Sequence, residues 1–310
     1  LDADVGQLVP TLANPQVLEG FEPAGAPKLR PAAGPITLRQ LLTHTSGFVY
    51  DMWNPMMKRW FEQTGFSRTD IYNDPAKCPP LGFDPGAKWE YGFSIDWAGK
   101  ALEAATGETL NDYLLANILQ PLGMAETGYV MPDSLRGRQA GVHQRQPDGT
   151  IVAAPYEHPQ GADPASFTGG GGMFGAPRDY ARFMRMILNR GELDGVRVLK
   201  PETVEQMTRN NIGHTPVTGL PTAAPHLTFA FDFFPGVEKR WGLSYMINMS
   251  DLKGGRKAGS LAWAGLRNTY FWIDPASGLG AAFFTQMLPF ADPKTLGVLE
   301  AFEAKLYASI

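Results

Sequence analysis

An aromatic hydroxyl, Tyr91, lies in the stretch KWEYGFSIDWAG, between a predicted tight turn and the first turn of a predicted helix. A free phenol has a pKa of about 10 and is a poor base at neutral pH. Lowering that pKa to about 7 requires roughly 4 kcal/mol of preference for the phenolate. One ammonium group at about 4 Å supplies roughly that amount at an effective dielectric constant near 20. If Tyr91 moves protons, it needs a lysine neighbour; otherwise it packs at a helix entrance with its hydroxyl on a backbone group.

Three other patterns resemble a dinucleotide-binding loop, a nucleophile elbow and a metal site, but each lacks a feature that its motif requires. The glycines of GGGGMFG, 169–175, have a dinucleotide-loop spacing, but no predicted strand precedes them, which favours a close backbone approach or a flexible loop. Ser46, in HTSGF, ends a predicted helix, whereas a nucleophile elbow begins one, so we do not expect it to be a nucleophile. The histidines show no i, i+4 pair and no acid at a metal-binding spacing; they are His44, His143, His158, His214 and His226. We therefore expect no metal and no organic cofactor.

The chain contains one Ser-x-x-Lys pattern, the pattern of a serine nucleophile with its lysine, in the segment NMSDLKGG. It consists of Ser250 and Lys253 and lies in a glycine-rich loop between two predicted strands. We therefore interpret this occurrence as a coincidence of sequence.

Composition excludes several classes of protein. With 310 residues and 44% hydrophobic residues, the chain can fill a substantial core. The net charge is -4, without a run of Lys or Arg, so nucleic acid and membrane surfaces are not expected partners. The single cysteine, Cys78, excludes an internal disulfide, and no stretch reaches the roughly 18 apolar residues of a membrane span. The chain begins with Leu1 and not with methionine, and we expect residues upstream of it.

Helix signals occupy the first two thirds of the chain. Thr37 is placed to cap a short helix within 35–48, Ser94 a helix that ends at Gly107, and Thr109 the next helix. Pro177 begins the clearest helix, which ends at Gly191. Residues 49–93 and 131–175 have no clean period and are predicted to be long ordered loops.

Short apolar and aromatic runs follow position 225 and predict antiparallel strands. They are HLTFAFDFF at 226–234, WGLSYMIN at 241–248, SLAWAG at 260–265, NTYFWID at 268–274 and LGAAFFTQM at 279–287. The final 16 residues, 295–310, form a predicted amphipathic helix. We expect an α+β fold with a mainly helical and loop region at 1–225, which includes Tyr91, and strands with a C-terminal helix at 226–310.

Five segments, in order, resemble the serine β-lactamase-related hydrolases, which include class C β-lactamases, D-alanyl-D-alanine peptidases and family VIII carboxylesterases. They are LLTHTSGF at 41–48, DPGAKWEYGFSIDWAGKALEAATG at 84–107, PLGMAETGY at 121–129, GGGGMFGAPRDYARFMRMIL at 169–188 and WAGLRNTYFWIDP at 263–275. The resemblance is greatest to the esterase branch. It implies the β-lactamase/transpeptidase-like fold, an antiparallel sheet flanked by helices with an inserted helical region.

The resemblance also implies three catalytic elements. Tyr91 matches the tyrosine that acts on protons at the nucleophile, and Phe93 stands where that motif has an asparagine. Trp263 stands where β-lactamases have a lysine, which provides an apolar wall, and Gly265 would leave the strand edge open to substrate. The N–H of Leu266 would point into an oxyanion hole. Arg267 is predicted on the same strand face by the period of two, and it keeps a cation available there.

The third implied element is the nucleophilic Ser-x-x-Lys, which the resemblance places upstream of Leu1. The expected activity is hydrolysis of small carboxylic esters through an acyl-enzyme, with a small-molecule ester as the only expected partner. Two alternatives remain open: a β-lactamase or D-alanyl-D-alanine peptidase, and a non-catalytic binding protein on the same fold. The departures at Phe93 and Trp263 favour esters over lactams.

Overall fold

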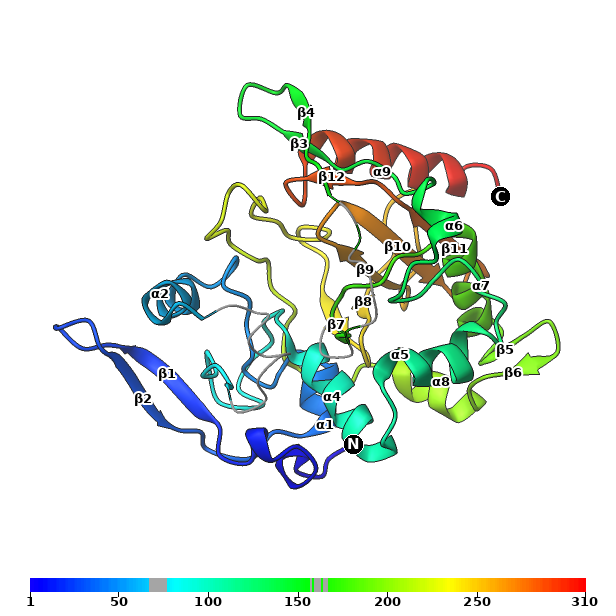
Figure 1. Cartoon of the computed structure of the whole chain (residues 1–310). Coiled ribbons are helices and arrows are strands. Elements are labelled where there is room, and N and C mark those ends of the chain that lie inside the picture. Colours follow the sequence, from blue (N-terminus) through cyan, green and yellow to red (C-terminus); the bar gives the residue numbers. More distant parts are fainter. Residues whose placement is uncertain (67–76, 157, 159–162, 164–166) are drawn as a thin grey trace.

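The computed structural model describes residues 1–66, 77–156, 158, 163 and 167–310, and it consists of a helical part beside an antiparallel sheet (Figure 1). A sheet of five strands is built from β7 (Lys239–Trp241), β8 (Met246–Asn248), β9 (Leu261–Gly265), β10 (Thr269–Asp274) and β11 (Leu279–Phe283). The strand order is β11-β10-β9-β8-β7, and every neighbouring pair is antiparallel. The fold is of the expected α+β class.

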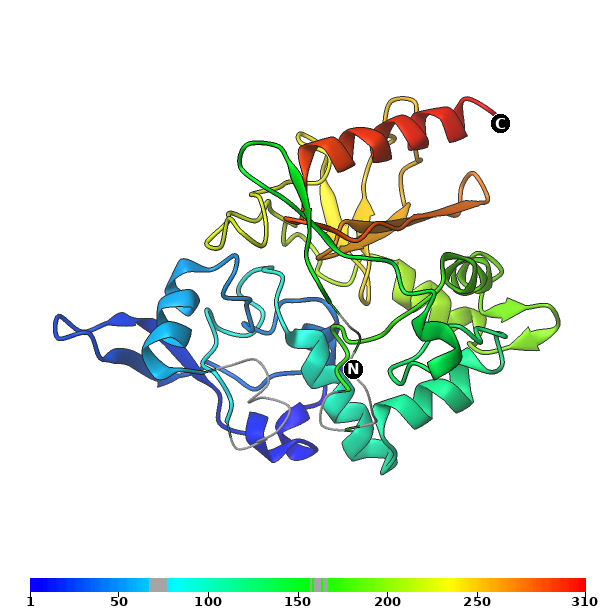
Figure 2. The same cartoon turned by 45° about the horizontal axis from the view of Figure 1, so that its top comes forward.

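Helices cover both faces of this sheet. In Figure 2, α9 (Pro293–Tyr307) crosses one face and α7 (Pro177–Leu188) lies on the opposite side. Phe302 of α9 contacts Trp272 on β10, with ring centroids 5.9 Å apart. On the other face, Tyr180 of α7 contacts Phe271, with ring centroids 5.1 Å apart. Alternate residues of β10 therefore pack on opposite helices, as the period of two in a strand requires.

The helical part consists of short helices joined by long ordered loops. It contains α1 (Leu38–Leu42), α2 (Pro55–Thr64), α4 (Ser94–Thr106), α5 (Leu110–Leu114), η3 (Leu115–Leu119), α6 (Asp133–Arg136) and α8 (Pro201–Thr208). Two 3-10 turns, η1 (Val5–Gln7) and η2 (Pro10–Leu12), precede the hairpin of β1 (Gln16–Phe21) and β2 (Pro27–Pro31), which projects from the molecule in Figure 1. Three small strands, β3 (His143–Arg145), β4 (Ile151–Ala153) and β12 (Met287–Leu288), form a separate sheet, and β5 (Glu192–Leu193) pairs with β6 (Val196–Arg197). Within the described residues, no helix is long and apolar enough to cross a bilayer.

Helix α1 begins where its capping signal predicts. The Thr37 hydroxyl accepts a hydrogen bond from the Gln40 N–H at 3.2 Å, and the Gln40 side chain accepts one from the Thr37 N–H at 2.8 Å. This reciprocal pair satisfies two of the four N–H groups that a helix start leaves unpaired. It fixes the direction of the chain that leads into HTSGF.

Glycines allow two loops to reach the start of α4. A Cβ at Gly92 would lie 2.1 Å from the Phe48 carbonyl oxygen, so only glycine lets the segment after Tyr91 cross so close to residue 48. A Cβ at Gly169 would lie 2.2 Å from the Ile95 carbonyl oxygen, and the Gly170 N–H donates to the Asp96 carboxylate at 2.7 Å. The glycine run at 169–175 is therefore a close backbone approach onto α4.

Several predicted elements differ from the structure. Residues 226–234 form no strand, only isolated bridges at Thr228 and Phe231, and Phe231, Phe233 and Phe234 pack against the core. The run 241–248 contains the turn between β7 and β8, with Ser244 in a left-handed conformation (φ 70°). Helix α2 lies in a region predicted to be loop, and Phe93, not Ser94, is the N-cap of α4.

Candidate active site

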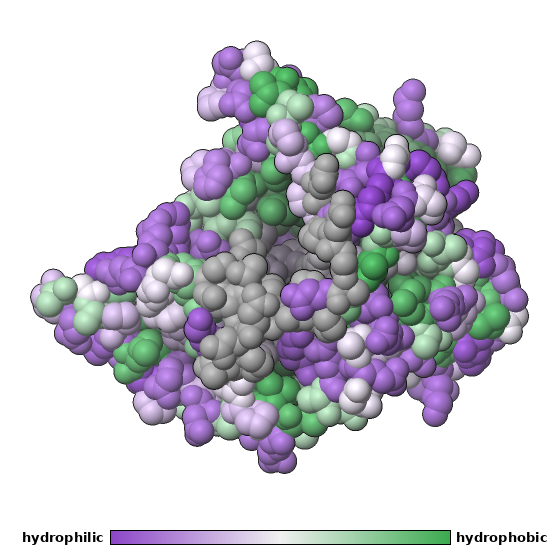
Figure 3. Space-filling model, viewed as in Figure 1, coloured by the Kyte–Doolittle hydropathy of each residue, from purple (hydrophilic) through white to green (hydrophobic). Residues whose placement is uncertain are grey.

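A cleft of about 930 Å³ lies between the helical part and the end of β9, lined by residues from both. Tyr91 is on the helical side, and Trp263, Gly265, Leu266 and Arg267 are on the sheet side. Figure 3 shows this hollow in the middle of the molecule, with apolar residues along its upper wall. The cleft thus brings together four of the five predicted site residues. Tyr91 is more than 170 positions away in the sequence from the other three, Trp263, Gly265 and Leu266.

Tyr91 is held in the cleft by a cage of aromatic rings. Its ring centroid lies 4.5 Å from that of His44, 4.7 Å from Trp263 and 5.5 Å from Tyr50. Trp53 adds a fourth contact at 5.6 Å. Ring contacts on several sides leave Tyr91 few alternative rotamers, which is what a side chain that transfers protons to a fixed partner requires.

His44 is the part of this cage that the sequence did not indicate. Its backbone is left-handed (φ 55°), its carbonyl accepts from the Glu90 N–H at 3.1 Å, and its Nδ1 accepts from the Gly92 N–H at 3.4 Å. These two hydrogen bonds hold the residues on either side of Tyr91 in the chain. Burial lowers the pKa of the His44 imidazole to about 3, so the ring is neutral at physiological pH and carries its proton on Nε2.

Trp263 forms the wall between the cleft and the interior of the helical part. Its ring contacts Trp241 at 4.6 Å and Trp89 at 6.3 Å, besides Tyr91. Its indole nitrogen is buried and has no hydrogen-bond partner among the residues that the structure describes, and neither has that of Trp89. Where a lysine would present a charge, this position therefore presents an apolar surface to the cleft.

Phe93 does not lie where the sequence placed it. It is fully buried, with ring centroids 5.2 Å from Phe48 and 5.9 Å from Tyr50, and it does not line the cleft. As the N-cap of α4 it turns into the core, while Tyr91, two residues earlier, faces the cleft. The prediction of Phe93 as a substrate-pocket residue is therefore wrong, although the position still carries no amide.

Gly265 and Leu266 lie where β9 turns into β10. Gly265 pairs with Thr269 across the hairpin, and a Cβ at Gly265 would lie 2.3 Å from the Thr269 hydroxyl oxygen. The turn is fixed by buried Asn268, whose amide donates to the carbonyls of Met287 at 2.9 Å and Pro289 at 2.8 Å. Leu266 is 37% exposed, and its N–H makes no backbone hydrogen bond with the described residues.

The described lining of the cleft contains no serine, cysteine or lysine. Ser46 is fully buried, and its hydroxyl is hydrogen-bonded to that of Ser94 at 2.8 Å. Ser250 and Lys253 are exposed in the loop between β8 and β9, away from the cleft lining. Neither Ser46 nor Ser250 is therefore placed to attack a substrate beside Tyr91.

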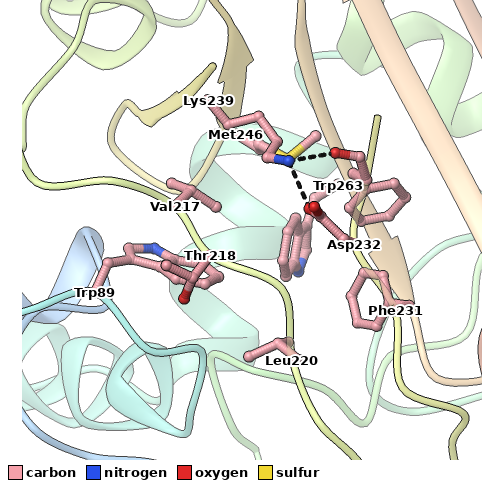
Figure 4. A pocket seen from close by; sticks show the side chains of 10 residues that line it. Trp89, Val217, Thr218, Leu220, Phe231, Asp232, Lys239, Met246 and Trp263 are labelled. Carbon is pink, nitrogen blue, oxygen red and sulfur yellow. Dashed lines mark hydrogen bonds and ion pairs between the residues drawn. The ribbon is translucent and has the colours of Figure 1, made fainter. Parts of the chain in front are cut away.

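One buried lysine lies behind the cleft wall. Lys239 is 5% exposed, and its Nζ donates to the Asp232 carboxylate at 2.5 Å and to the Phe233 carbonyl at 2.6 Å (Figure 4). It lines a cavity of about 10 Å³ on whose wall Trp263 and Phe231 also lie. The Lys239 ammonium therefore has an anionic partner and a second acceptor inside the protein.

The described residues include no group of three or more His, Cys, Asp or Glu side chains that could hold a metal ion. Cys78 donates to the Pro79 carbonyl at 3.6 Å, and burial raises its pKa to about 12. Such a thiol is inert as a nucleophile.

Comparisons with known proteins give the family of this chain. The β-lactamase family model matches residues 1–304. The chain is 34% identical to the monacolin J acid methylbutanoyltransferase of Aspergillus terreus, over 99% of this chain and 76% of that protein. It is 28% identical to the lovastatin esterase of Penicillium rubens, over 99% of this chain and 78% of that protein.

Solved structures give the same family. A mutant of the simvastatin synthase LovD from Aspergillus terreus superimposes with a TM-score of 0.83 at 33% identity, covering 100% of this chain and 76% of that one. EstCE1, a hydrolase with promiscuous acyltransferase activity, matches in fold with a TM-score of 0.71 at 20% identity, over 97% of this chain and 77% of that one. The chain belongs to the β-lactamase family, among relatives that are acyltransferases and esterases.

Proposed function

We propose that this protein is a serine acyl-transfer enzyme that cleaves small carboxylic esters through an acyl-enzyme. The observation that carries the proposal is the position of Tyr91, caged in the cleft opposite the end of β9. The proposal assigns proton transfer to the Tyr91 hydroxyl and stabilisation of an oxyanion to the Leu266 N–H at the end of β9.

In this mechanism a serine attacks the acyl carbon of the ester, and a lysine beside it holds Tyr91 as a proton acceptor. The N–H of Leu266 binds the developing oxyanion, and the alcohol leaves with the proton that Tyr91 returns. The described cleft residues supply neither the serine nor the lysine. Their location upstream of Leu1, in a Ser-x-x-Lys, is part of the proposal.

Esters suit the cleft better than β-lactams or peptides. A lysine at the position of Trp263 would attract the carboxylate of a β-lactam, whereas Trp263 packs with four other aromatic rings and gives an apolar surface. An aromatic cluster of Trp53, Phe231 and Phe290 extends this surface within the cleft. Burying an apolar acyl chain against such a surface is favourable, because both lose contact with water.

A second candidate is transfer of the acyl group to an alcohol in place of water. The relatives that favour it are named methylbutanoyltransferases of monacolin J acid and of ML-236A carboxylate. A cleft of about 930 Å³ is also large enough to hold a bulky acceptor beside the acyl group.

The test compares two chromogenic substrates with the full protein. We expect release of p-nitrophenol from p-nitrophenyl butyrate at a kcat/KM at least about 100 times that for opening of a chromogenic cephalosporin, since each 1.4 kcal/mol of transition-state preference is tenfold. A cephalosporin turned over faster than the ester would make the protein a lactamase. No turnover of either, with the ester still bound, would favour a binding protein on the same fold. Adding an alcohol and measuring the new ester tests the second candidate.

A further inference from the structure

The buried ammonium group of Lys239 ties down a segment that carries part of the cleft wall. Lys239 lies on β7, and its side chain links the two ends of the loop 234–238. Its Nζ donates to the Asp232 carboxylate and to the Phe233 carbonyl, the two residues that directly follow Phe231 (Figure 4). Lys239 is only 5% exposed, so little water competes for these two hydrogen bonds.

The backbone fixes both ends of this link. Lys239 pairs with Asn248 of β8, and its carbonyl accepts a hydrogen bond from the Val217 N–H at 3.4 Å. Phe231 exchanges two backbone hydrogen bonds with Leu220, at 2.9 and 3.0 Å. The ammonium therefore joins a strand of the sheet to a segment that is itself held, and it sets where the residues after Phe231 lie relative to the sheet.

The tied segment supplies one aromatic ring to the cleft and one behind its wall. Phe231 lines the cleft, where its ring centroid lies 6.4 Å from that of Trp53. Phe233 lines the small cavity behind the wall and packs on Phe231 at 5.0 Å and on Trp263 at 5.7 Å. Trp263 in turn contacts Tyr91 at 4.7 Å. A displaced segment would thus move Phe231 in the cleft and remove a support of Trp263.

We propose that Lys239 is a positioning residue that sets the acyl-chain selectivity of the cleft, because it holds Phe231 and the ring behind Trp263 in one arrangement. The inference rests on the proposed function and deepens it on the acyl side of the site. A buried ammonium suits this task, since separation from its two acceptors would leave a charge without partners inside the protein. The wall therefore does not yield to a longer acyl chain unless this link breaks.

The experiment measures kcat/KM of the full protein for p-nitrophenyl butyrate and p-nitrophenyl octanoate. The wild type should prefer the butyrate, and Lys239→Met should lower the ratio of the two values about tenfold, through a lower KM for the octanoate. Asp232→Asn removes the anion but keeps the Phe233 carbonyl as acceptor, so it should lower the ratio about threefold. The control is Glu303→Gln, which breaks a buried ion pair with Arg256 outside the cleft and should keep the wild-type ratio.

Three results overturn the inference while the proposed function stands. They are equal kcat/KM for both esters in the wild type, an unchanged ratio in Lys239→Met, and a ratio that falls as far in Glu303→Gln, since lost stability alone would then explain the change. If Lys239→Met does not fold, Asp232→Asn decides: a lowered ratio supports the inference, and an unchanged ratio overturns it.

Hydrogen exchange separates the link from the reaction. If the wild type hydrolyses neither ester, the proposed function fails, and the exchange of the backbone N–H groups of Phe231 and Leu220 then tests the link. Exchange at these positions should be at least about tenfold faster in Lys239→Met than in the wild type, and less affected in Glu303→Gln. Equal exchange in Lys239→Met and the wild type would show that Lys239 does not hold this segment.

Discussion

The imidazole of His44 lies against the phenol of Tyr91, with ring centroids 4.5 Å apart, and its Nδ1 accepts the N–H of the next residue, Gly92. The carbonyl of His44 holds the N–H of Glu90, the residue before Tyr91. One residue of the HTSGF segment thus fixes both backbone neighbours of Tyr91 and one face of its ring. This relationship makes His44 a positioning residue for the proposed proton transfer.

The burial of His44 predicts a dependence of stability on pH. The pKa of about 3 that burial gives His44 in the folded chain lies below the usual imidazole value of 6.5, so at pH values between the two the unfolded chain binds a proton that the folded chain does not. Stability is therefore complete above about pH 6.5 and is lost as the pH falls, by about 1.4 kcal/mol per unit for this single proton.

Urea unfolding at pH 4.5, 5.5 and 6.5 measures this slope. His44→Asn, which tolerates the left-handed backbone, should reduce it by about one proton. Replacing the exposed His143 by Asn in the same way serves as the control and should leave the wild-type slope. Equal slopes in the wild type and His44→Asn would show that His44 does not titrate between its folded and unfolded states.

The contact with Tyr91 predicts a separate effect on the reaction. Loss of the imidazole ring frees the Tyr91 side chain to adopt other rotamers, so His44→Asn should lower kcat for p-nitrophenyl butyrate about tenfold or more. KM should change less than about threefold, because His44 does not line the cleft. A variant that is folded by circular dichroism but loses activity only through KM would contradict the positioning role.

A buried ion pair anchors the C-terminal helix and predicts a large stability effect. Arg256, in the loop before β9, is 3% exposed, and its Nε donates to Glu303 of α9 at 2.9 Å. Its guanidinium also stacks over Trp272 at 4.6 Å. Glu303→Gln leaves a buried cation without its anion and should lower the free energy of unfolding by about 3 kcal/mol.

Chemical denaturation of the Glu303→Gln variant checks this value. The matched control is Glu62→Gln, which removes the exposed partner of Lys58 on α2 and should have little effect, because exposed pairs contribute little. Equal effects of the two substitutions would mean that Arg256 finds another partner or solvent when Glu303 is changed.

Local signals account for the parts of the fold that the sequence predicted. Thr37 and Pro177 act within one helical turn of themselves, and β9 to β11 carry strongly patterned aromatic residues, so these elements appear as expected. Residues 226–234 have the composition of a strand, but Phe231, Phe233 and Phe234 pack against the core without forming one. Tertiary contacts determine whether a short aromatic run becomes a strand. The sequence analysis did not predict helix α2, although Asn54 caps it and Pro55 begins it. The helix has only 10 residues and lies in a stretch, 49–93, without a clean hydrophobic period.

In the candidate site, too, the sequence did not predict the features that depend on tertiary contacts. The resemblance to the β-lactamase-related hydrolases implied that Tyr91 and Trp263 belong to one site, and both line the same cleft. His44 could not be found in this way, because its role depends on a left-handed backbone and on a crossing that Gly92 permits. Phe93 was misplaced because the turn into α4 directs it to the core, which no motif specifies.

The most direct test of the central claim is the rate of Tyr91→Phe in the full protein. This substitution removes only the hydroxyl and retains the ring that packs on His44, Trp263 and Tyr50. The steady-state kcat for p-nitrophenyl butyrate should fall by roughly 100-fold to 10,000-fold, the usual contribution of a positioned acid–base group. Tyr113→Phe, on α5 and outside the cleft, should retain the wild-type rate. An unchanged kcat in Tyr91→Phe would contradict the account.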